Sequence, residues 1–140
     1  MTDTPEPLGP QDALVAVMIA TAAADEKLTD IELVKISGIL DLIPVFAHYP
    51  KDRVQVISAL VADLFEDEDG IDALVGLVAA ALPDRLRETA YALACDVAAA
   101  DGRIAQTEAR LLEIIRQDLG VGRLASAAIE RGARARHQTL

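Results

Sequence analysis

The sequence contains few aromatic residues and a single cysteine. Aromatic side chains make up 3% of its 140 residues, and tryptophan is absent. The core must therefore be built from Ala, Leu, Val and Ile, which suit closely packed helices. Cys95 cannot form an internal disulfide, which favours a reducing compartment. Because Ile19 holds the equivalent position in the repeat described below, we expect Cys95 to be a buried, unreactive thiol.

The sequence also lacks long apolar runs and an excess of basic residues. The longest uncharged apolar run, residues 13–24, has 12 residues, whereas a membrane-spanning helix needs about 20. Residues 1–10 lack the basic start and apolar centre of a signal peptide. The formal net charge of −10 opposes binding to nucleic acid. We therefore expect a cytoplasmic protein with no nucleic-acid partner and no integral membrane segment.

Basic residues are concentrated at the C-terminal end of the acidic chain. Residues 121–140 carry four arginines against one acidic residue, Glu130. These arginines either stabilise the negative end of a solvated helix or contact the acidic body, another subunit or an anionic membrane. Peripheral membrane contact, protein partners and the oligomeric state are therefore left open.

Apolar spacing predicts an all-α, compact bundle of about seven helices, without strands. The predicted helices cover residues 11–24, 29–42, 51–65, 71–82, 83–98, 105–119 and 121–133. The helix over 71–82 is apolar nearly all round, so we expect it to be the most enclosed. In the helix over 29–42, Ile31, Val34, Ile39 and Leu42 are expected on the apolar face. The predicted organisation is a disordered leader (1–10), a helical domain (11–135) and a flexible tail (136–140).

One sequence pattern occurs twice. AADEKLTDIE at residues 23–32 recurs as AADGRIAQTE at residues 99–108. Each copy joins two predicted helices through an acidic loop, and the match pairs Asp25 with Asp101 and Glu32 with Glu108. We expect the two helix–loop–helix units to pack about a pseudo-twofold axis, an internal repeat that brings the loops together.

Paired acidic loops predict a cation site. Carboxylates that converge without a counter-charge repel one another, which favours binding of a hard cation. The candidate ligands are Asp25, Glu32, Asp96, Asp101 and Glu108. Oxygen ligands without a nearby His or Cys indicate calcium, magnesium or manganese rather than zinc. Neither loop is a complete EF-hand, because Val97 and Ala99 would occupy the first ligand positions of the second loop and Glu26 replaces the tight-turn glycine of the first.

Local structure accounts for part of this acidic set. Thr29 and Glu32 match a helix capping box, and Asp25 is favourable in a turn. Glu108 is not explained in this way, because its partner position holds Ala105, which cannot cap a helix. Asp96 lies in an alanine-rich segment, where it either faces solvent or has a functional role.

The chain shows no recognisable catalytic motif. Neither glycine-rich phosphate-binding pattern occurs, and His48 and His137 lie in a predicted loop and in the tail. No nucleophile stands at a recognisable spacing from a base. We therefore expect a non-enzymatic protein.

The segment ACDVAAADGRIAQTEARLLEIIRQDLGV, together with its earlier copy, resembles the TerB family of tellurite resistance proteins. The resemblance covers about residues 13–135 and is strongest over 82–120. It implies an all-α fold with a two-helix repeat, a cytoplasmic role in tellurite and stress resistance, and acidic residues that bind a divalent metal. Those acidic positions fall on Asp25, Glu32, Asp96, Asp101 and Glu108. The sequence departs from the family pattern at Glu26, where many copies have Gly, and at Ala20, opposite Asp96.

Three functional hypotheses follow, in decreasing order of support from the sequence. The first is a stress-response domain in which the paired loops bind a divalent cation. The second is a metal-independent protein–protein interaction module in a stress-response complex, with an apolar groove and the basic segment from Arg131 to Arg136 as its contacts. The third is a thiol-dependent tellurite reductase, which retention of resistance by Cys95→Ser would eliminate.

Overall fold

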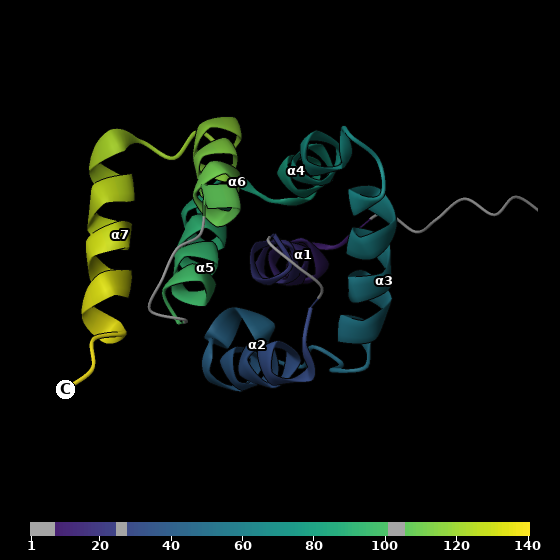
Figure 1. The fold of residues 1–140 in the computed structure, drawn as a ribbon, viewed down its shortest axis with the longest axis horizontal. Coiled ribbons are helices and arrows are strands. Elements are labelled where there is room, and N and C mark those ends of the chain that lie inside the picture. Colours follow the sequence, from purple (N-terminus) through teal and green to yellow (C-terminus); the bar gives the residue numbers. More distant parts are fainter. Residues whose placement is uncertain (1–7, 25–27, 101–105) are drawn as a thin grey trace, which may run out of the picture.

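The computed structural model describes residues 8–24, 28–100 and 106–140, and these form an all-helical fold (Figure 1). The α-helices are α1 (Pro10–Ala22), α2 (Asp30–Leu42), α3 (Arg53–Phe65), α4 (Gly70–Ala81), α5 (Arg87–Ala99), α6 (Gln106–Asp118) and α7 (Arg123–Arg136). Two 3₁₀ helices, Pro44–Phe46 and Asp84–Leu86, precede α3 and α5. The predicted all-α fold of seven helices is confirmed for the described part of the chain.

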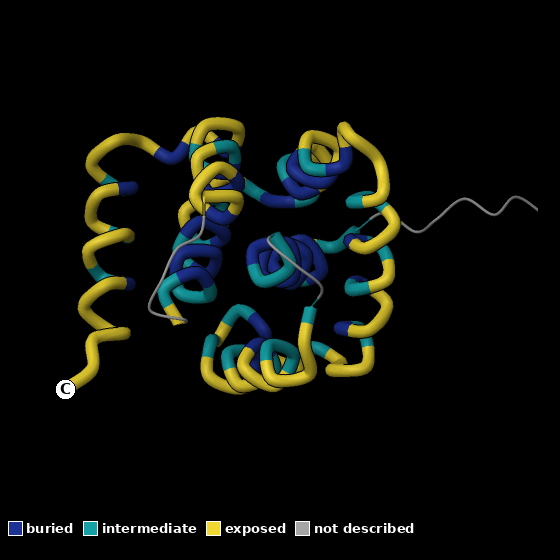
Figure 2. Tube along the Cα trace, in the orientation of Figure 1, coloured by how far each residue is buried: buried dark blue, intermediate teal, exposed yellow. Residues whose placement is uncertain are grey.

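Helix α1 lies at the centre of the molecule, and the other helices are arranged around it (Figures 1 and 2). Every residue from 12 to 21 is buried. The helix packs most extensively against α5, α3 and α4. Small residues such as Ala16 and Ala20 let these neighbours approach closely, while Leu14 and Met18 fill the space between them.

The prediction that the helix over 71–82 is the most enclosed is wrong. Helix α4 buries Leu74, Val75 and Val78, but Leu77 on its outer face is 42% exposed. Apolar side chains on all faces suit an enclosed helix. The apolar composition of α4 alone does not determine which helix lies at the centre of the bundle. In the structure, that helix is α1.

The predicted apolar face of α2 is also wrong in part. Ile36 and Leu40 are the buried residues of this helix, whereas Ile31, Val34 and Leu42 are 70%, 70% and 80% exposed. The helix carries apolar residues on two faces, and the one that includes Ile36 and Leu40 contacts the body. The other face is left in solvent.

Two helix ends follow the sequence-based predictions. Thr29 and Glu32 form the predicted capping box: the Thr29 side chain accepts from the Glu32 backbone N–H (3.2 Å), and Glu32 Oε1 accepts from the Thr29 backbone N–H (3.1 Å). Gly120 ends α6 with a φ of +68°. The Val121 N–H donates to the carbonyl of Arg116 (3.0 Å), which completes a Schellman motif.

Two other helix boundaries differ from the predictions. Pro83 does not lie in the first turn of α5, because the 3₁₀ helix Asp84–Leu86 intervenes. Helix α7 continues to Arg136 rather than fraying after Ala133. The Arg136 side chain contacts α5, and this contact helps to order the last turn of α7.

The proposed pseudo-twofold repeat stays a prediction. Helices α1 and α2 pack together, as do α5 and α6. The two loops that define the repeat include residues 25–27 and 101–105, which lie outside the described residues. The environments of the paired helices also differ, because α1 is enclosed and α5 lies beside it.

Candidate functional site

Three of the five predicted metal ligands lie at helix ends next to the acidic loops. Glu32 is in the first turn of α2, Asp96 in the last turn of α5, and Glu108 in the first turn of α6. Asp25 and Asp101 lie outside the described residues. The structure therefore describes the flanks of the predicted site and not the loops themselves.

Glu32 and Asp96 each have contacts within the chain. Glu32 Oε1 accepts hydrogen bonds from the backbone and side chain of Thr29. Asp96 Oδ1 forms an ion pair with Arg136, whose Nη2 lies 2.6 Å away, and His137 Nε2 lies 3.5 Å from the same oxygen. A cation bound by Asp96 would have to use the other oxygen or displace Arg136.

Glu108 is the most enclosed of the described candidates. It is 7% exposed, and it also interacts within the chain. Carboxylates are rarely buried unless they are paired or hydrogen-bonded, so this position is under a specific constraint. Among residues 8–24, 28–100 and 106–140, no three His, Cys, Asp or Glu side chains are grouped as a metal ion would require. Glu32, Asp96 and Glu108 alone thus do not form a metal centre.

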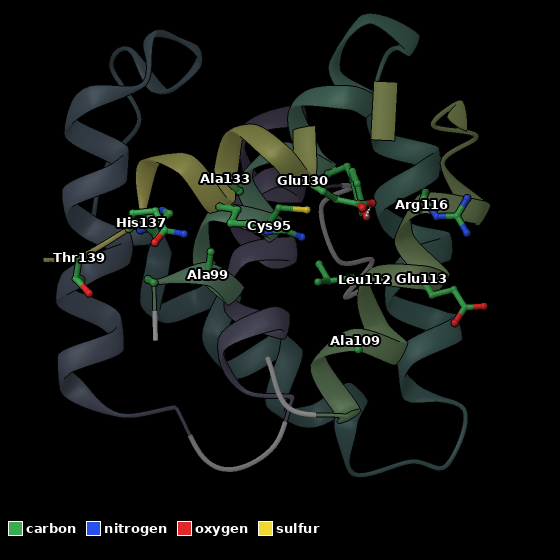
Figure 3. A pocket seen from close by; sticks show the side chains of 14 residues that line it. Cys95, Ala99, Ala109, Leu112, Glu113, Arg116, Glu130, Ala133, His137 and Thr139 are labelled. Atoms are coloured by element: carbon green, nitrogen blue, oxygen red, sulfur yellow. Dashed lines mark hydrogen bonds between the residues drawn. The ribbon is translucent and has the colours of Figure 1, made fainter. Parts of the chain in front are cut away.

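A groove of about 840 Å³ lies between α5, α6 and the C-terminal segment. This volume is in the range of ligand-binding pockets. Figure 3 shows His137 and Thr139 at one end, Cys95, Ala133 and Leu112 in the middle, and Glu130, Glu113 and Arg116 towards the other end. The groove thus combines small apolar side chains with charged groups of both signs.

Cys95 lies in this groove but is 5% exposed. Burial raises the pKa of its thiol to about 11, so the thiol is neutral at pH 7. The neighbouring Tyr91 hydroxyl donates to Glu130 Oε2 (2.6 Å) and links α5 to α7. The burial of Cys95 agrees with the prediction, and its neutral state favours an unreactive thiol.

A buried polar cluster at Asp12 was not found from the sequence. Asp12 is 9% exposed, and its carboxylate accepts hydrogen bonds from the Tyr49 hydroxyl (2.8 Å) and from Arg53 Nη2 (2.7 Å). The cluster joins the start of α1 to the segment before α3. The only signal in the sequence is a single acidic residue just before the uncharged run of residues 13–24. This residue does not indicate which distant residues it contacts.

The same contacts determine the charge state of the Asp12 cluster. Burial alone would raise the pKa of Asp12, but hydrogen bonds from Arg53 and Tyr49 and the charge of Arg53 lower it overall. Burial and the hydrogen bond to Asp12 raise the pKa of Tyr49. Asp12 is therefore ionised and Tyr49 protonated at neutral pH. We interpret the cluster as structural, because its charged groups are paired with one another.

We expect Asp12→Asn to lower the free energy of unfolding at pH 7 by about 1–2 kcal/mol, because Arg53 loses its charged acceptor while solvent partly screens the pair. The folded-state pKa of Asp12 is lowered, so its contribution is complete above the ordinary value of 3.8 and is lost as pH falls through the folded-state value. Urea unfolding across this range measures the difference. It should shrink at low pH, and the exposed Asp84→Asn variant should show no such difference.

No described helix combines the length and the apolar character needed to cross a membrane. Peripheral contact and protein partners remain predictions.

The chain matches the model of a known family. The model of the family described as Tellurite resistance protein TerB matches residues 11–131, which is most of the chain. No curated protein and no solved structure matches the chain.

Proposed function

The chain belongs to the TerB family of tellurite resistance proteins, and from this premise we propose that it is a non-enzymatic stress-response domain whose two acidic loops bind a divalent cation. Calcium, magnesium and manganese are the candidate ions, because the proposed ligands are all carboxylates. The bound ion would hold the two helix–loop–helix units in one arrangement that a partner protein recognises. The cytoplasmic location predicted from the sequence is part of the proposal.

The burial of Glu108 carries this proposal. The Glu108 carboxylate, in the first turn of α6, is 7% exposed, which supports a specific role for this residue. Asp96 lies in the last turn of α5, on the other side of the second acidic loop. All three described candidates supply oxygen donors, which fits a hard cation. In this arrangement, the helix ends provide Glu32, Asp96 and Glu108, and the loops provide Asp25 and Asp101.

Titration calorimetry of chelator-treated protein with the three ions tests the proposal. We expect saturable binding of one ion, and an ion concentration 100 times the dissociation constant should stabilise the fold by about 2.7 kcal/mol. Binding should be lost in the Asp101→Asn, Glu108→Gln double variant. Glu32→Gln should weaken binding while keeping the helix start, because glutamine also completes a capping box.

The matched control is Asp118→Asn, at the exposed end of α6. It removes an acidic charge from the same helix without changing the proposed ligands, so it should bind the ion normally. Absence of both heat and a melting shift at millimolar concentrations of all three ions would contradict the proposal. If Asp118→Asn and Glu108→Gln weaken ion binding equally, binding depends only on the overall charge of the protein and the proposal is wrong.

A metal-independent interaction module is the second candidate function. The observation that favours it is the groove of about 840 Å³. Its lining includes Arg134 of the predicted basic segment and the apolar residues Leu112 and Ala133. In this case, partner binding should survive chelation and the Asp101→Asn, Glu108→Gln changes. It should be lost when Ala133→Phe fills the groove, provided that the variant remains folded by circular dichroism.

A further inference from the structure

The outer face of α2 carries a continuous apolar stripe. Ile31, Val34 and Leu42 are 70–80% exposed. With Gly38 they are spaced by three, four and four residues, which places all four on one side of a helix. Single exposed aliphatic residues are ordinary, but an aligned set with no cover is typical of a contact surface.

No element in the described part of the chain covers this stripe. Helix α2 packs mainly on α1, and its buried residues are Ile36 and Leu40. Figure 2 shows α2 as an outer element with exposed residues along its length. The stripe is therefore not part of the core of this chain.

Gly38 is in the middle of α2, where glycine weakens a helix relative to alanine. A Cβ atom built at Gly38 meets no atom within 4 Å, so no neighbour in this chain requires the missing side chain. A glycine at the centre of an exposed stripe leaves room for a second helix to approach closely, because the distance between packed helices depends on the side chains at the contact.

The charges beside the stripe are self-complementary about the same glycine. Lys35 and Asp41 each lie three residues from Gly38, on opposite sides, and Val34 and Leu42 each lie four residues from it. In an antiparallel pair of identical helices that cross at Gly38, Lys35 lies level with Asp41 of the partner subunit, on the other flank of the contact, and its long side chain can reach across the glycine. Val34 is likewise level with the partner's Leu42. The twofold axis repeats both contacts.

We propose that α2 is a self-association surface, on which two copies of the chain pack antiparallel about a twofold axis at Gly38. Asp41 forms an ion pair with Lys51 (2.5 Å), and the exposed Lys35 also has an interaction within the chain. Neither prevents this, since contacts between exposed charged side chains exchange readily and contribute little. One helix pair buries a small area, and each copy has a net charge of −10, so the dimer is weak and reversible. The proposal does not depend on metal binding.

Sedimentation velocity over roughly 20–500 µM protein, in enough salt to screen the net charge, measures the association. We expect a monomer–dimer equilibrium in this range. Val34→Asp should weaken it at least tenfold. Val56→Asp is the control, because Val56 is 54% exposed on α3 and lies outside the stripe. A chain that remains monomeric at the highest concentration would overturn the proposal.

Two glycine variants separate association from stability. Gly38 and Gly76 both lie inside helices with nothing within 4 Å of the added Cβ. Each change to alanine should raise the melting temperature of the monomer by roughly 2–4 °C. Only Gly38→Ala should weaken the dimer. If both variants dimerise like the wild type, the helices do not cross at Gly38.

Charge exchange tests the proposed register. Lys35→Glu alone places two acids together at each contact, and Asp41→Lys alone places two lysines together, so each variant should associate poorly with itself. A mixture of the two variants restores an opposite pair at both contacts and should dimerise again. Failure of the mixture, with both variants folded and the wild type dimeric, would overturn the antiparallel arrangement.

Discussion

Replacing Leu14 with alanine is expected to lower the free energy of unfolding by roughly 2–5 kcal/mol, because the change leaves a cavity in the most enclosed helix. The Leu14 side chain has 0% exposure, and α1 is surrounded by the other helices. Its neighbours belong to several helices, so no single side chain can move in to fill the space. Denaturant unfolding monitored by circular dichroism at neutral pH measures the loss.

The control for this prediction is the same substitution on the surface. Leu124 is 86% exposed on α7, so Leu124→Ala should change the free energy of unfolding by less than about 0.5 kcal/mol. Similar small losses at Leu14 and Leu124 would contradict the central position of α1. A large loss at Leu14 alone would support it.

Gly70→Ala is expected to destabilise the fold by about 3 kcal/mol or more, because the added methyl group would overlap the backbone of α3. An ideal Cβ at Gly70 would lie 1.8 Å from the carbonyl oxygen of Leu64 and 2.6 Å from its carbonyl carbon. Backbone atoms cannot rotate aside as a flexible side chain can. The turn between α3 and α4 must therefore open, which shifts Leu74 and Val78 in the core.

Gly76→Ala, in the same helix, is the matched control for Gly70→Ala. Its Cβ meets nothing within 4 Å, so the better helix propensity of alanine should stabilise α4 by roughly 0.5–1 kcal/mol. The two changes are thus expected to have opposite signs in the same unfolding experiment. Equal effects would show that the close approach at Gly70 does not constrain the turn.

Features decided by neighbouring residues could be predicted from the sequence. The capping box of Thr29 and Glu32 depends on residues three apart, and the left-handed Gly120 depends on glycine alone. The helical class followed from apolar spacing over each segment. These features need no knowledge of how the helices pack.

Features decided by packing could not be predicted in the same way. Helix α2 has two apolar faces, and the spacing of Ile31, Val34 and Leu42 is as regular as a buried stripe. Only the position of α1 determines that Ile36 and Leu40 face inwards. The apolar composition of α4 likewise predicted enclosure, although α4 lies at the edge of the bundle.

The same distinction between local features and features decided by packing applies to the candidate site. The repeat predicts a ligand at Glu108, which has no capping role to explain it, and this carboxylate is buried as a constrained residue would be. The ion pair of Asp96 with Arg136 and the cluster of Asp12 with Arg53 each join residues about 40 positions apart. Charge pattern alone does not select such partners.

The enclosure of α1 has a consequence for synthesis on the ribosome. This helix emerges before α5, one of its main packing partners, which begins at Arg87. The nascent chain must therefore keep the largely apolar helix α1 without its complete cover until α5 has been translated. Chaperone binding to stalled chains should accordingly be strongest before α5 leaves the exit tunnel and should fall once it has.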